Sequence, residues 1–287
     1  MSLPARVALA HDLVAEAGRM IRTALAAPDL GVQSKGPGDV VTETDFAVER
    51  MLRAGIAGSF PDDAVIGEEL GGAPAASGCT WLIDPVDGTV NFSRRINYFC
   101  VSLALLENGE PVAAWVLDPQ SDELFSAGPD GVARLNGRPV GATSVSELSD
   151  TVAGLGFSTR HRQTLQAEVV GALTAAGAEH RRLGAGALCL AHVAAGRLDA
   201  YLEPHMNPWD AVGGLYLARC AGAVTGVYTD LVNGGVVYAA APSISPRLLA
   251  LLPEPFSGTP LHRENEPRSA GELRADRAPI PNQETRQ

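Results

Sequence analysis

The chain has 287 residues, of which 46% are hydrophobic, enough for one large domain or two small ones with a buried core. Its formal net charge of −11 disfavours the basic surface that nucleic-acid binding needs, so we expect no nucleic-acid partner. Apolar runs are too short to span a membrane, and we expect neither a membrane contact nor a signal peptide. The cysteines lie far apart in apolar contexts and are expected to be free thiols in a reducing cytoplasm: Cys79, Cys100, Cys189 and Cys220.

Two helices are predicted near the N-terminus. Apolar residues at helical spacing predict the first helix over residues 3–27. A loop rich in helix breakers, residues 28–38, follows it and carries Lys35. The second helix comes after a short extended piece, and either Thr44 or Asp45 is expected to cap it.

The rest of the first half is expected to form a largely antiparallel sheet that these two helices cover. The dipeptides Asn108-Gly109 and Asn136-Gly137 are strong signals for type I′ hairpin turns. A short buried strand brings Glu68 to its end, although a solvated turn is the more ordinary explanation of two adjacent acids. Strands are predicted at residues 64–66, 98–107, 111–117, 123–127 and 131–135.

A change of composition at residues 144–150 marks a boundary. It separates an N-terminal α+β subdomain, residues 1–146, from a C-terminal α/β subdomain, residues 147–255, in which strands and helices alternate. Strands are predicted there at 152–157, 199–202, 224–228 and 236–240, helices at 162–176, 186–196 and 209–221, and a closing segment at 246–252. Residues 256–287 are polar and rich in proline, arginine and glutamate, which predicts a disordered tail.

The most informative stretch carries two aspartates in a tight turn after an apolar run. Pro85 pushes the residue before it into an extended conformation, so Asp84 is expected at the end of a strand. Gly88 permits a positive φ just after Asp87. The two carboxylates and the carbonyl of Val86 therefore face one small volume.

The chemistry of this turn suits a metal ion and a phosphate. Carboxylate and carbonyl oxygens are preferred by hard cations such as Mg²⁺, and the amides of Gly88 and Thr89 can hold an anion. Asp-Pro and Asp-Gly pairs are also common in ordinary surface turns. A calcium-binding EF-hand loop is excluded because its ligands alternate along the chain, which the spacing of Asp84 and Asp87 does not reproduce.

Further acids stand at comparable positions elsewhere, and the whole set resembles the inositol monophosphatase family, within a wider superfamily of lithium-sensitive, metal-dependent phosphatases. Any one motif is weak, but together they are specific. They span roughly Ala8 to Leu252 and occur in the family order: Asp39-Val40-Val41-Thr42-Glu43-Thr44-Asp45, Gly67-Glu68-Glu69, Asp84-Pro85-Val86-Asp87-Gly88-Thr89-Val90-Asn91-Phe92 and Trp209-Asp210-Ala211.

The resemblance implies a mixed α/β fold, a layered αβαβα sandwich, and hydrolysis of a phosphomonoester with two or three Mg²⁺ ions. The implied metal ligands are Glu68, Asp84, the carbonyl of Val86, Asp87 and Asp210. In the implied catalytic group, Thr89 pairs with Asp45 to orient and help deprotonate the attacking water, which Glu68 also contacts. The amides of Gly88 and Thr89 would bind the phosphate.

Substrate recognition is implied at five positions: Asp87, Gly184, Ala185, Glu203 and Asp210. Glu203 stands where the family places a carboxylate that binds substrate hydroxyls, and a surface acid is an equal alternative. Ala185 replaces the usual serine or threonine, which removes a side-chain hydrogen bond. Lys35 matches a family lysine near the metal site, with a mobile loop cation as the alternative. His205 is expected to be structural rather than part of the rim.

The substrate class and partners also follow from the resemblance. Val90-Asn91-Phe92 favours inositol 1-phosphate as the substrate of first choice. Histidinol phosphate, 3′-phosphoadenosine 5′-phosphate and fructose 1,6-bisphosphate remain alternatives on the same fold. The resemblance further implies a cytoplasmic homodimer that lithium inhibits. A non-enzymatic rival is a regulatory protein that binds other proteins, including transcription machinery.

Overall fold

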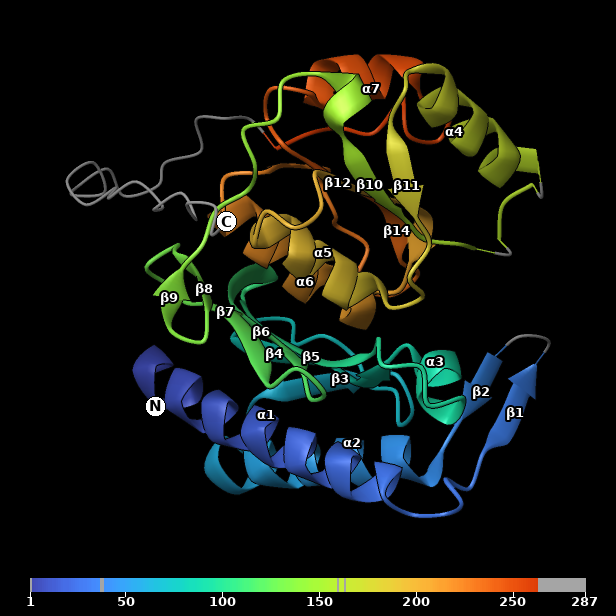
Figure 1. Cartoon of the computed structure of the whole chain (residues 1–287). Helices are drawn as coiled ribbons and strands as arrows, with labels where there is room; N and C mark the ends of the chain where they lie inside the picture. The colour runs from blue at the N-terminus through green and yellow to red at the C-terminus, as the bar shows by residue number, and fades with distance from the viewer. Residues whose placement is uncertain (1, 37–38, 159, 163, 263–287) are drawn as a thin grey trace, which may run out of the picture.

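The computed structural model describes residues 2–36, 39–158, 160–162 and 164–262, and they form five alternating layers of helices and sheets (Figure 1). This arrangement confirms the expected mixed α/β, αβαβα sandwich. From one face to the other, the layers are the helices α1 (Leu3–Leu25) and α2 (Glu43–Ser59), a seven-stranded sheet, the helices α5 (Gly186–Ala194) and α6 (Pro208–Cys220), a five-stranded sheet, and the helices α4 (Thr164–Ala175) and α7 (Ser245–Leu251).

The seven-stranded sheet is antiparallel except for one parallel pair, β3 with β4. Its strands are paired in chain order: β3 (Ala64–Gly67), β4 (Cys79–Asp87), β5 (Cys100–Glu107), β6 (Glu110–Asp118), β7 (Glu123–Ala127), β8 (Ala133–Leu135) and β9 (Arg138–Pro139). Both predicted hairpin turns are confirmed by positive φ angles, 53° and 86° at Asn108-Gly109 and 48° and 77° at Asn136-Gly137.

The five-stranded sheet is mixed, with the order β11-β10-β12-β14-β13. Its strands are β10 (Val152–Leu155), β11 (Glu179–Arg181), β12 (Ala200–Met206), β13 (Val224–Thr225) and β14 (Gly235–Ala240). The prediction of a strand at 224–228 was too long, and that at 199–202 too short. The strand β11 was missed, because its three residues, Glu-His-Arg, carry no apolar pattern.

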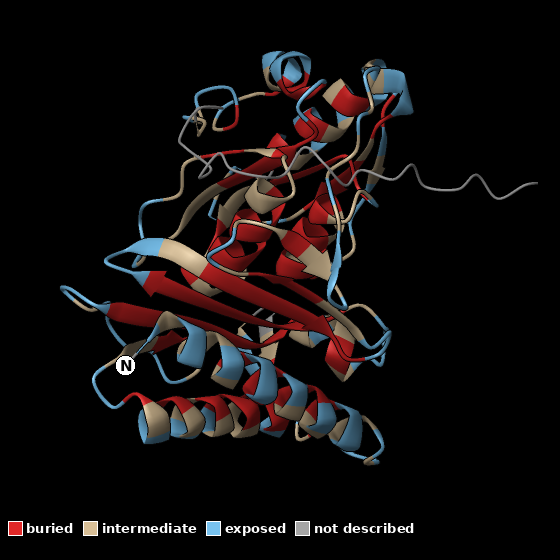
Figure 2. Cartoon of the chain, turned by 90° about the vertical axis from the view of Figure 1, so that its left-hand side faces the viewer, coloured by how far each residue is buried: buried red, intermediate tan, exposed pale blue. Residues whose placement is uncertain are grey.

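Four buried hydrophobic clusters fill the four spaces between the five layers. Figure 2 shows the buried residues concentrated on the strands and on the inward faces of the helices. In the central layer α5 and α6 lie close together, since a Cβ at Gly214 would sit only 2.5 Å from the Cβ of Leu190. A glycine at this point of α6 therefore sets how closely the two helices approach.

Three local predictions need correction. Lys35 does not lie in a loop but on β1 (Gln33–Gly36), which pairs with β2 (Asp39–Val41) in a separate hairpin. The N-cap of α2 is Thr42, not Thr44 or Asp45; its side chain accepts a hydrogen bond from the Thr44 amide, and Asp45 at the third helical position closes a capping box. Asp84 does not end its strand, since β4 continues through an irregular register to Asp87.

The predicted tail does not begin at residue 256. Phe256 is 1% exposed and belongs to the cluster beneath α4 and α7. Leu261 forms a bridge with Gly226, and the amide of Val227 donates to the carbonyl of Pro260 at 2.7 Å. Residues 263–287, the remainder of the predicted tail, lie outside the described residues.

The boundary predicted at residues 146–147 stays a prediction. Each of the two large sheets is built from residues on one side of this boundary. The helices α5 and α6, however, pack against both sheets. Across the described part of the chain, every helix is too short or too polar to traverse a bilayer.

Candidate metal centre and substrate cavity

Three carboxylates that are remote in sequence meet in the space between the seven-stranded sheet and α6. Single oxygen atoms of Glu68, Asp84 and Asp210 all lie within 4.8 Å of one another. Asp84 is 1% exposed, while the other two are partly buried. The predicted convergence of these three acids is therefore what the structure contains.

The local structure explains how each carboxylate reaches this point. Glu68 follows β3 directly, and its amide donates to the carbonyl of Ile83 on the parallel neighbour β4, which places it beside Asp84. Asp210 lies in the first turn of α6, which begins at Pro208, a residue suited to a helix start. The side-chain amide of Asn207 donates to Asp210 at 3.4 Å.

Burial and mutual repulsion both disfavour the ionised form of these carboxyl groups. Burial raises the pKa of Glu68 to about 7, and the neighbouring acids add to the rise. Burial followed by the charges of Glu68 and the other aspartates raises the pKa of Asp84, and burial with Glu68 raises that of Asp210. A cation in their midst would relieve both effects.

One cation of the protein already contacts the edge of this cluster. The ammonium group of Lys35 lies 3.1 Å from Glu68 and 2.6 Å from Glu69. Burial acts to lower the pKa of Lys35, but the two carboxylates outweigh it and raise that pKa. The family-based placement of Lys35 near the metal site thus agrees with its position, although a strand rather than a loop carries it.

The donor set fits a hard divalent cation. It consists of carboxylate oxygens from three residues, in a buried setting where anions repel each other and the described residues supply only Lys35 as an ion-pair partner. All-oxygen ligation is the preference of Mg²⁺ and Ca²⁺ rather than of zinc or copper. Glu68, Asp84 and Asp210 would hold such an ion.

The remaining predicted ligands lie close by but play other parts in the structure. Both carboxylate oxygens of Asp87 accept hydrogen bonds from the N-terminus of α5, at 3.2 Å from the Gly186 amide and 2.7 Å from the Ala187 amide. Burial raises the pKa of Asp87 to about 6, against these two amides, which lower it. The N-cap of α5 is Ala185, whose side chain cannot accept a hydrogen bond. The carboxylate of Asp87 therefore caps this helix in its place.

The carbonyl of Val86 faces the predicted catalytic pair. The Thr89 hydroxyl lies 2.9 Å from that carbonyl and 3.2 Å from a carboxylate oxygen of Asp45. Asp45 is fully buried, and burial raises its pKa although Thr42 donates two hydrogen bonds to it. Gly88 has the positive φ that was predicted, 91°, and begins the short helix α3 (Thr89–Ser93).

A cavity of about 680 Å³ opens beside this group and unites the predicted substrate positions. The lining residues that had been predicted are Asp87, Gly184, Ala185, Glu203 and Asp210. Glu203 accepts a hydrogen bond from Tyr201 at 2.5 Å, and burial raises its pKa to about 8. It is therefore not the exposed surface acid of the alternative interpretation.

Sequence reasoning missed several residues of this cavity. Arg160, Arg182 and Phe157 also line it, as does His205, which had been expected to be structural. The position of Arg182, two residues before the Gly184-Ala185-Gly186 turn, was the available signal. Asn91 connects this turn to α3, since its side-chain amide lies 2.8 Å from the carbonyls of both Tyr98 and Leu183.

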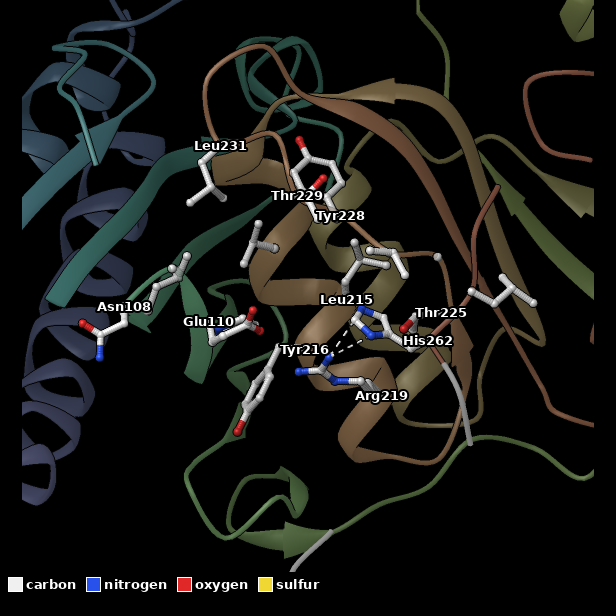
Figure 3. Close-up of a pocket in the computed structure, with 17 residues that line it drawn as sticks. Asn108, Glu110, Leu215, Tyr216, Arg219, Thr225, Tyr228, Thr229, Leu231 and His262 are labelled. Atoms are coloured by element: carbon white, nitrogen blue, oxygen red, sulfur yellow. Dashed lines mark hydrogen bonds between the residues drawn. The ribbon is translucent and has the colours of Figure 1, made fainter. Parts of the chain in front are cut away.

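A second cavity of about 510 Å³ lies at the other end of α6 (Figure 3). Figure 3 shows Arg219 of α6 and His262 side by side, with Glu110 on the opposite wall. Among the described residues that line it, Glu110 is the sole carboxylate, and mostly apolar side chains surround it. This cavity therefore lacks the donors for a metal centre.

Comparison with known proteins agrees with the fold. The family model "Inositol monophosphatase family" matches residues 5–254. An inositol-1-monophosphatase of Mycobacterium bovis is 39% identical over 279 residues, covering 89% of this chain and 96% of that protein. The Nus factor SuhB of Escherichia coli is 35% identical over 250 residues, covering 84% and 93%.

A solved structure shows the same architecture. The extragenic suppressor protein suhB from Bartonella henselae superposes with a TM-score of 0.81 at 28% identity, covering 88% of this chain and 99% of that one. Since the family model spans nearly all the described residues and the relatives match over most of their length, this chain belongs to the inositol monophosphatase family.

Proposed function

We propose that the protein is a Mg²⁺-dependent phosphomonoesterase that hydrolyses a small polyol or sugar monophosphate, with inositol 1-phosphate as the first choice. The observation that carries this proposal is the convergence of Glu68, Asp84 and Asp210 beside a cavity that Asp210 helps to line. Membership of the inositol monophosphatase family supports the reaction class. Two or three Mg²⁺ ions would bind, with Asp87 and the Val86 carbonyl as further ligands.

The chemistry that Mg²⁺ would supply is polarisation of the phosphoryl group and neutralisation of its charge. The chain's own residues would then position the water and the leaving alcohol. Thr89 can accept a hydrogen bond from water while donating its own proton to Asp45, at 3.2 Å. Asp45, buried and with a raised pKa, can hold a proton next to this hydroxyl. Glu68 would contact the same water from the other side.

Phosphate and alcohol would be held by separate groups. The amides of Gly88 and Thr89 would bind phosphate oxygens. Glu203 would accept hydrogen bonds from the substrate hydroxyls, since it lines the cavity. Gly184 and Ala185 would contact the polyol through backbone atoms, because Ala185 has no hydroxyl to offer.

A second candidate function is binding to another protein. The Escherichia coli relative is called a Nus factor, and its name does not mention a phosphatase. A protein of that kind should tolerate loss of the acidic cluster. We also propose a cytoplasmic homodimer, in which the buried thiols of Cys79, Cys100 and Cys189 stay reduced.

A substrate panel with and without Mg²⁺ tests the first proposal. We expect Mg²⁺-dependent release of phosphate from inositol 1-phosphate, and inhibition by millimolar Li⁺, which the family resemblance motivates. The panel should include histidinol phosphate, 3′-phosphoadenosine 5′-phosphate and fructose 1,6-bisphosphate. Faster turnover of histidinol phosphate would refute the inositol assignment. Absence of turnover on every ester would favour the protein-binding rival.

A further inference from the structure

Glu49 is a fully buried carboxylate that lies outside the sequence motifs. It stands on α2 one helical turn after Asp45 and is 0% exposed. Arg53, one further turn along, donates to it at 2.7 Å. Because residues four apart lie on one face of a helix, these three side chains form a polar stripe along α2. Buried ion pairs contribute little net stability, since desolvation offsets their attraction, so the other contacts of Glu49 matter more than its pairing with Arg53.

The Glu49 carboxylate holds the turn that carries Glu68. Its two oxygens accept hydrogen bonds from the amides of the next two residues, Glu69 at 2.8 Å and Leu70 at 3.2 Å. The amide of Glu68 itself donates to the carbonyl of Ile83 on β4 at 3.1 Å. The backbone of Glu68 is therefore fixed by β4 at its own amide and by α2 at the two amides that follow.

A glycine at position 67 makes room for this carboxylate. A Cβ there would lie 2.1 Å from Oε1 of Glu49, which is closer than any ordinary contact of a Cβ. The amides and carbonyls of Gly67 and Gly71 pair with each other at 3.0 and 3.1 Å and close the turn. Arg53 donates to the Gly71 carbonyl and, at 3.4 Å, to that of Val65. The turn is thus shaped around the pair of Glu49 and Arg53.

The polar stripe of α2 reaches both groups that the proposed reaction uses. Asp45 accepts a hydrogen bond from Thr89 at 3.2 Å, and Glu49, one turn along the same helix, holds the turn of Glu68. A single rigid element therefore relates the proposed catalytic pair to the metal centre. Residues that orient a metal ligand through hydrogen bonds typically contribute about ten- to a hundred-fold to metal affinity.

We propose that Glu49 is a positioning residue for the metal ion, because it fixes the Glu68 carboxylate where it can bind a divalent cation together with Asp84 and Asp210. This inference rests on the proposed metal-dependent function. Glu49 acts only through Glu68 and is not itself a member of the acidic cluster. Its loss should therefore weaken metal binding without abolishing it, and excess metal should compensate.

Calorimetric titration of the metal-free protein with Mg²⁺ alone tests this proposal. Glu49→Gln keeps the shape of the side chain but replaces one of its two acceptor oxygens by a donor, so one of the two turn amides loses its partner. We expect the Kd for Mg²⁺ to rise about ten-fold. Gly67→Ala, which places a Cβ against the same carboxylate, should raise this Kd as well. It carries the test if Glu49→Gln does not fold.

Asp63→Asn is the matched control. Asp63 is likewise a side chain nearly closed to solvent that pairs with an arginine, Arg6, at 2.7 Å, but its partners lie on α1 and β4 rather than on the turn of Glu68. This variant should lower the melting temperature and leave the Kd for Mg²⁺ at the wild-type value. A wild-type Kd in both Glu49→Gln and Gly67→Ala would overturn the proposal. An equal rise of the Kd in Asp63→Asn would also overturn it.

Steady-state kinetics separates failure of this inference from failure of the proposed function. In Glu49→Gln the Mg²⁺ concentration for half-maximal turnover of inositol 1-phosphate should rise about ten-fold. At saturating Mg²⁺, kcat and KM should stay within about two-fold of wild type. A lower kcat with unchanged Mg²⁺ dependence would indicate a merely structural role and contradict the proposal. Absence of turnover in wild type, with the difference in Kd intact, would overturn the proposed function but keep the role of Glu49.

Discussion

Asp210 joins two halves of the site at the scale of a single residue. It comes from α6, whereas Glu68 follows β3 and Asp84 lies on the neighbouring strand β4, and oxygen atoms of the three meet within 4.8 Å. Their raised pKa values reflect burial together with mutual repulsion. Neutralising one acid should therefore harm metal binding without harming the fold.

We expect Asp210→Asn to lower turnover at least about 100-fold, because a metal ion contributes several kcal/mol to transition-state stabilisation. The metal-free variant should melt no lower than wild type, since a repelling charge is removed. Mg²⁺ should raise the melting temperature of wild type more than that of the variant. Asp12→Asn, on the exposed face of α1, is the control. Full activity in Asp210→Asn would contradict the metal assignment.

His192 gives a pH dependence that is independent of the metal centre. It lies on α5 with its ring against Tyr98 and Phe125 and accepts or donates a hydrogen bond with the Tyr98 hydroxyl at 3.2 Å. Burial, followed by the charge of Arg197, lowers the pKa of His192 to about 4. The folded protein therefore keeps this imidazole neutral at pH values where the unfolded chain protonates it.

The sign of the effect follows from linkage. Between pH 6.5 and 4 the unfolded state binds more protons at this residue, so the free energy of unfolding falls as the pH is lowered. The loss should approach about 3 kcal/mol near pH 4. Urea denaturation of wild type and His192→Gln at pH 7.5 and pH 4.5 measures it. The difference between the two proteins should shrink at the lower pH; a constant difference would contradict this prediction.

At the scale of elements, the start of α2 shows what local sequence leaves open. Thr42, Thr44 and Asp45 are all good N-cap residues, and their order along the chain does not choose among them. The structure selects Thr42 because Asp45 then falls at the third helical position, where it accepts from the Thr42 amide at 2.9 Å. The same carboxylate contacts Thr89, so the cap of α2 also orients a residue of the proposed catalytic pair.

We expect Thr42→Ala to destabilise the protein by about 1 kcal/mol, because the capping box loses its hydroxyl. Turnover should fall as well, since Asp45 loses the short hydrogen bond that fixes its side chain. Thr44→Ala, in the same turn, should cost less and leave turnover near wild type. Denaturant titration and steady-state kinetics of the two variants decide the matter. A larger loss in Thr44→Ala would reverse the assignment of the cap.

Elements with strong local signals were predicted well, and those that depend on distant partners were not. Both Asn-Gly turns and the positive φ of Gly88 follow from backbone preferences of single residues. By contrast, β1, which carries Lys35, and the polar β11 exist because a neighbouring strand pairs with them. The pattern of apolar residues within either segment does not indicate which strand will pair with it.

At the scale of the whole molecule, the family resemblance supplied the order of the layers and the ligand set, which composition alone could not. The acids were identified by their place in motifs, but their distances came only with the fold. Arg160 was missed because it lies in no motif, and Arg182 because it lies just outside one; their relation to the cavity appears only when β10, β12 and α5 are packed together. The C-terminal segment was misjudged for a similar reason, since the burial of Phe256 depends on α4 and α7.

Truncation tests where the folded body ends. Removing residues 257–287 deletes the Val227–Pro260 hydrogen bond, the bond from His262 to the Thr225 carbonyl and the bridge at Leu261. We expect a loss of about 2 kcal/mol in the free energy of unfolding. Removing only residues 263–287 keeps these contacts and should keep both stability and turnover. Equal stability of the two truncated proteins would contradict a structural role for residues 257–262.

The hydrogen bonds from Asp87 to the start of α5 have a consequence for how the protein assembles. Asp87, from the first half of the chain, accepts hydrogen bonds from the start of α5 in the second half, and Asp210 from the second half completes the acidic cluster with Glu68 and Asp84 from the first. Neither half can therefore present a finished cage by itself. If the proposed metal site is real, tight binding of a divalent ion is expected only in the entire polypeptide, after its two portions have docked.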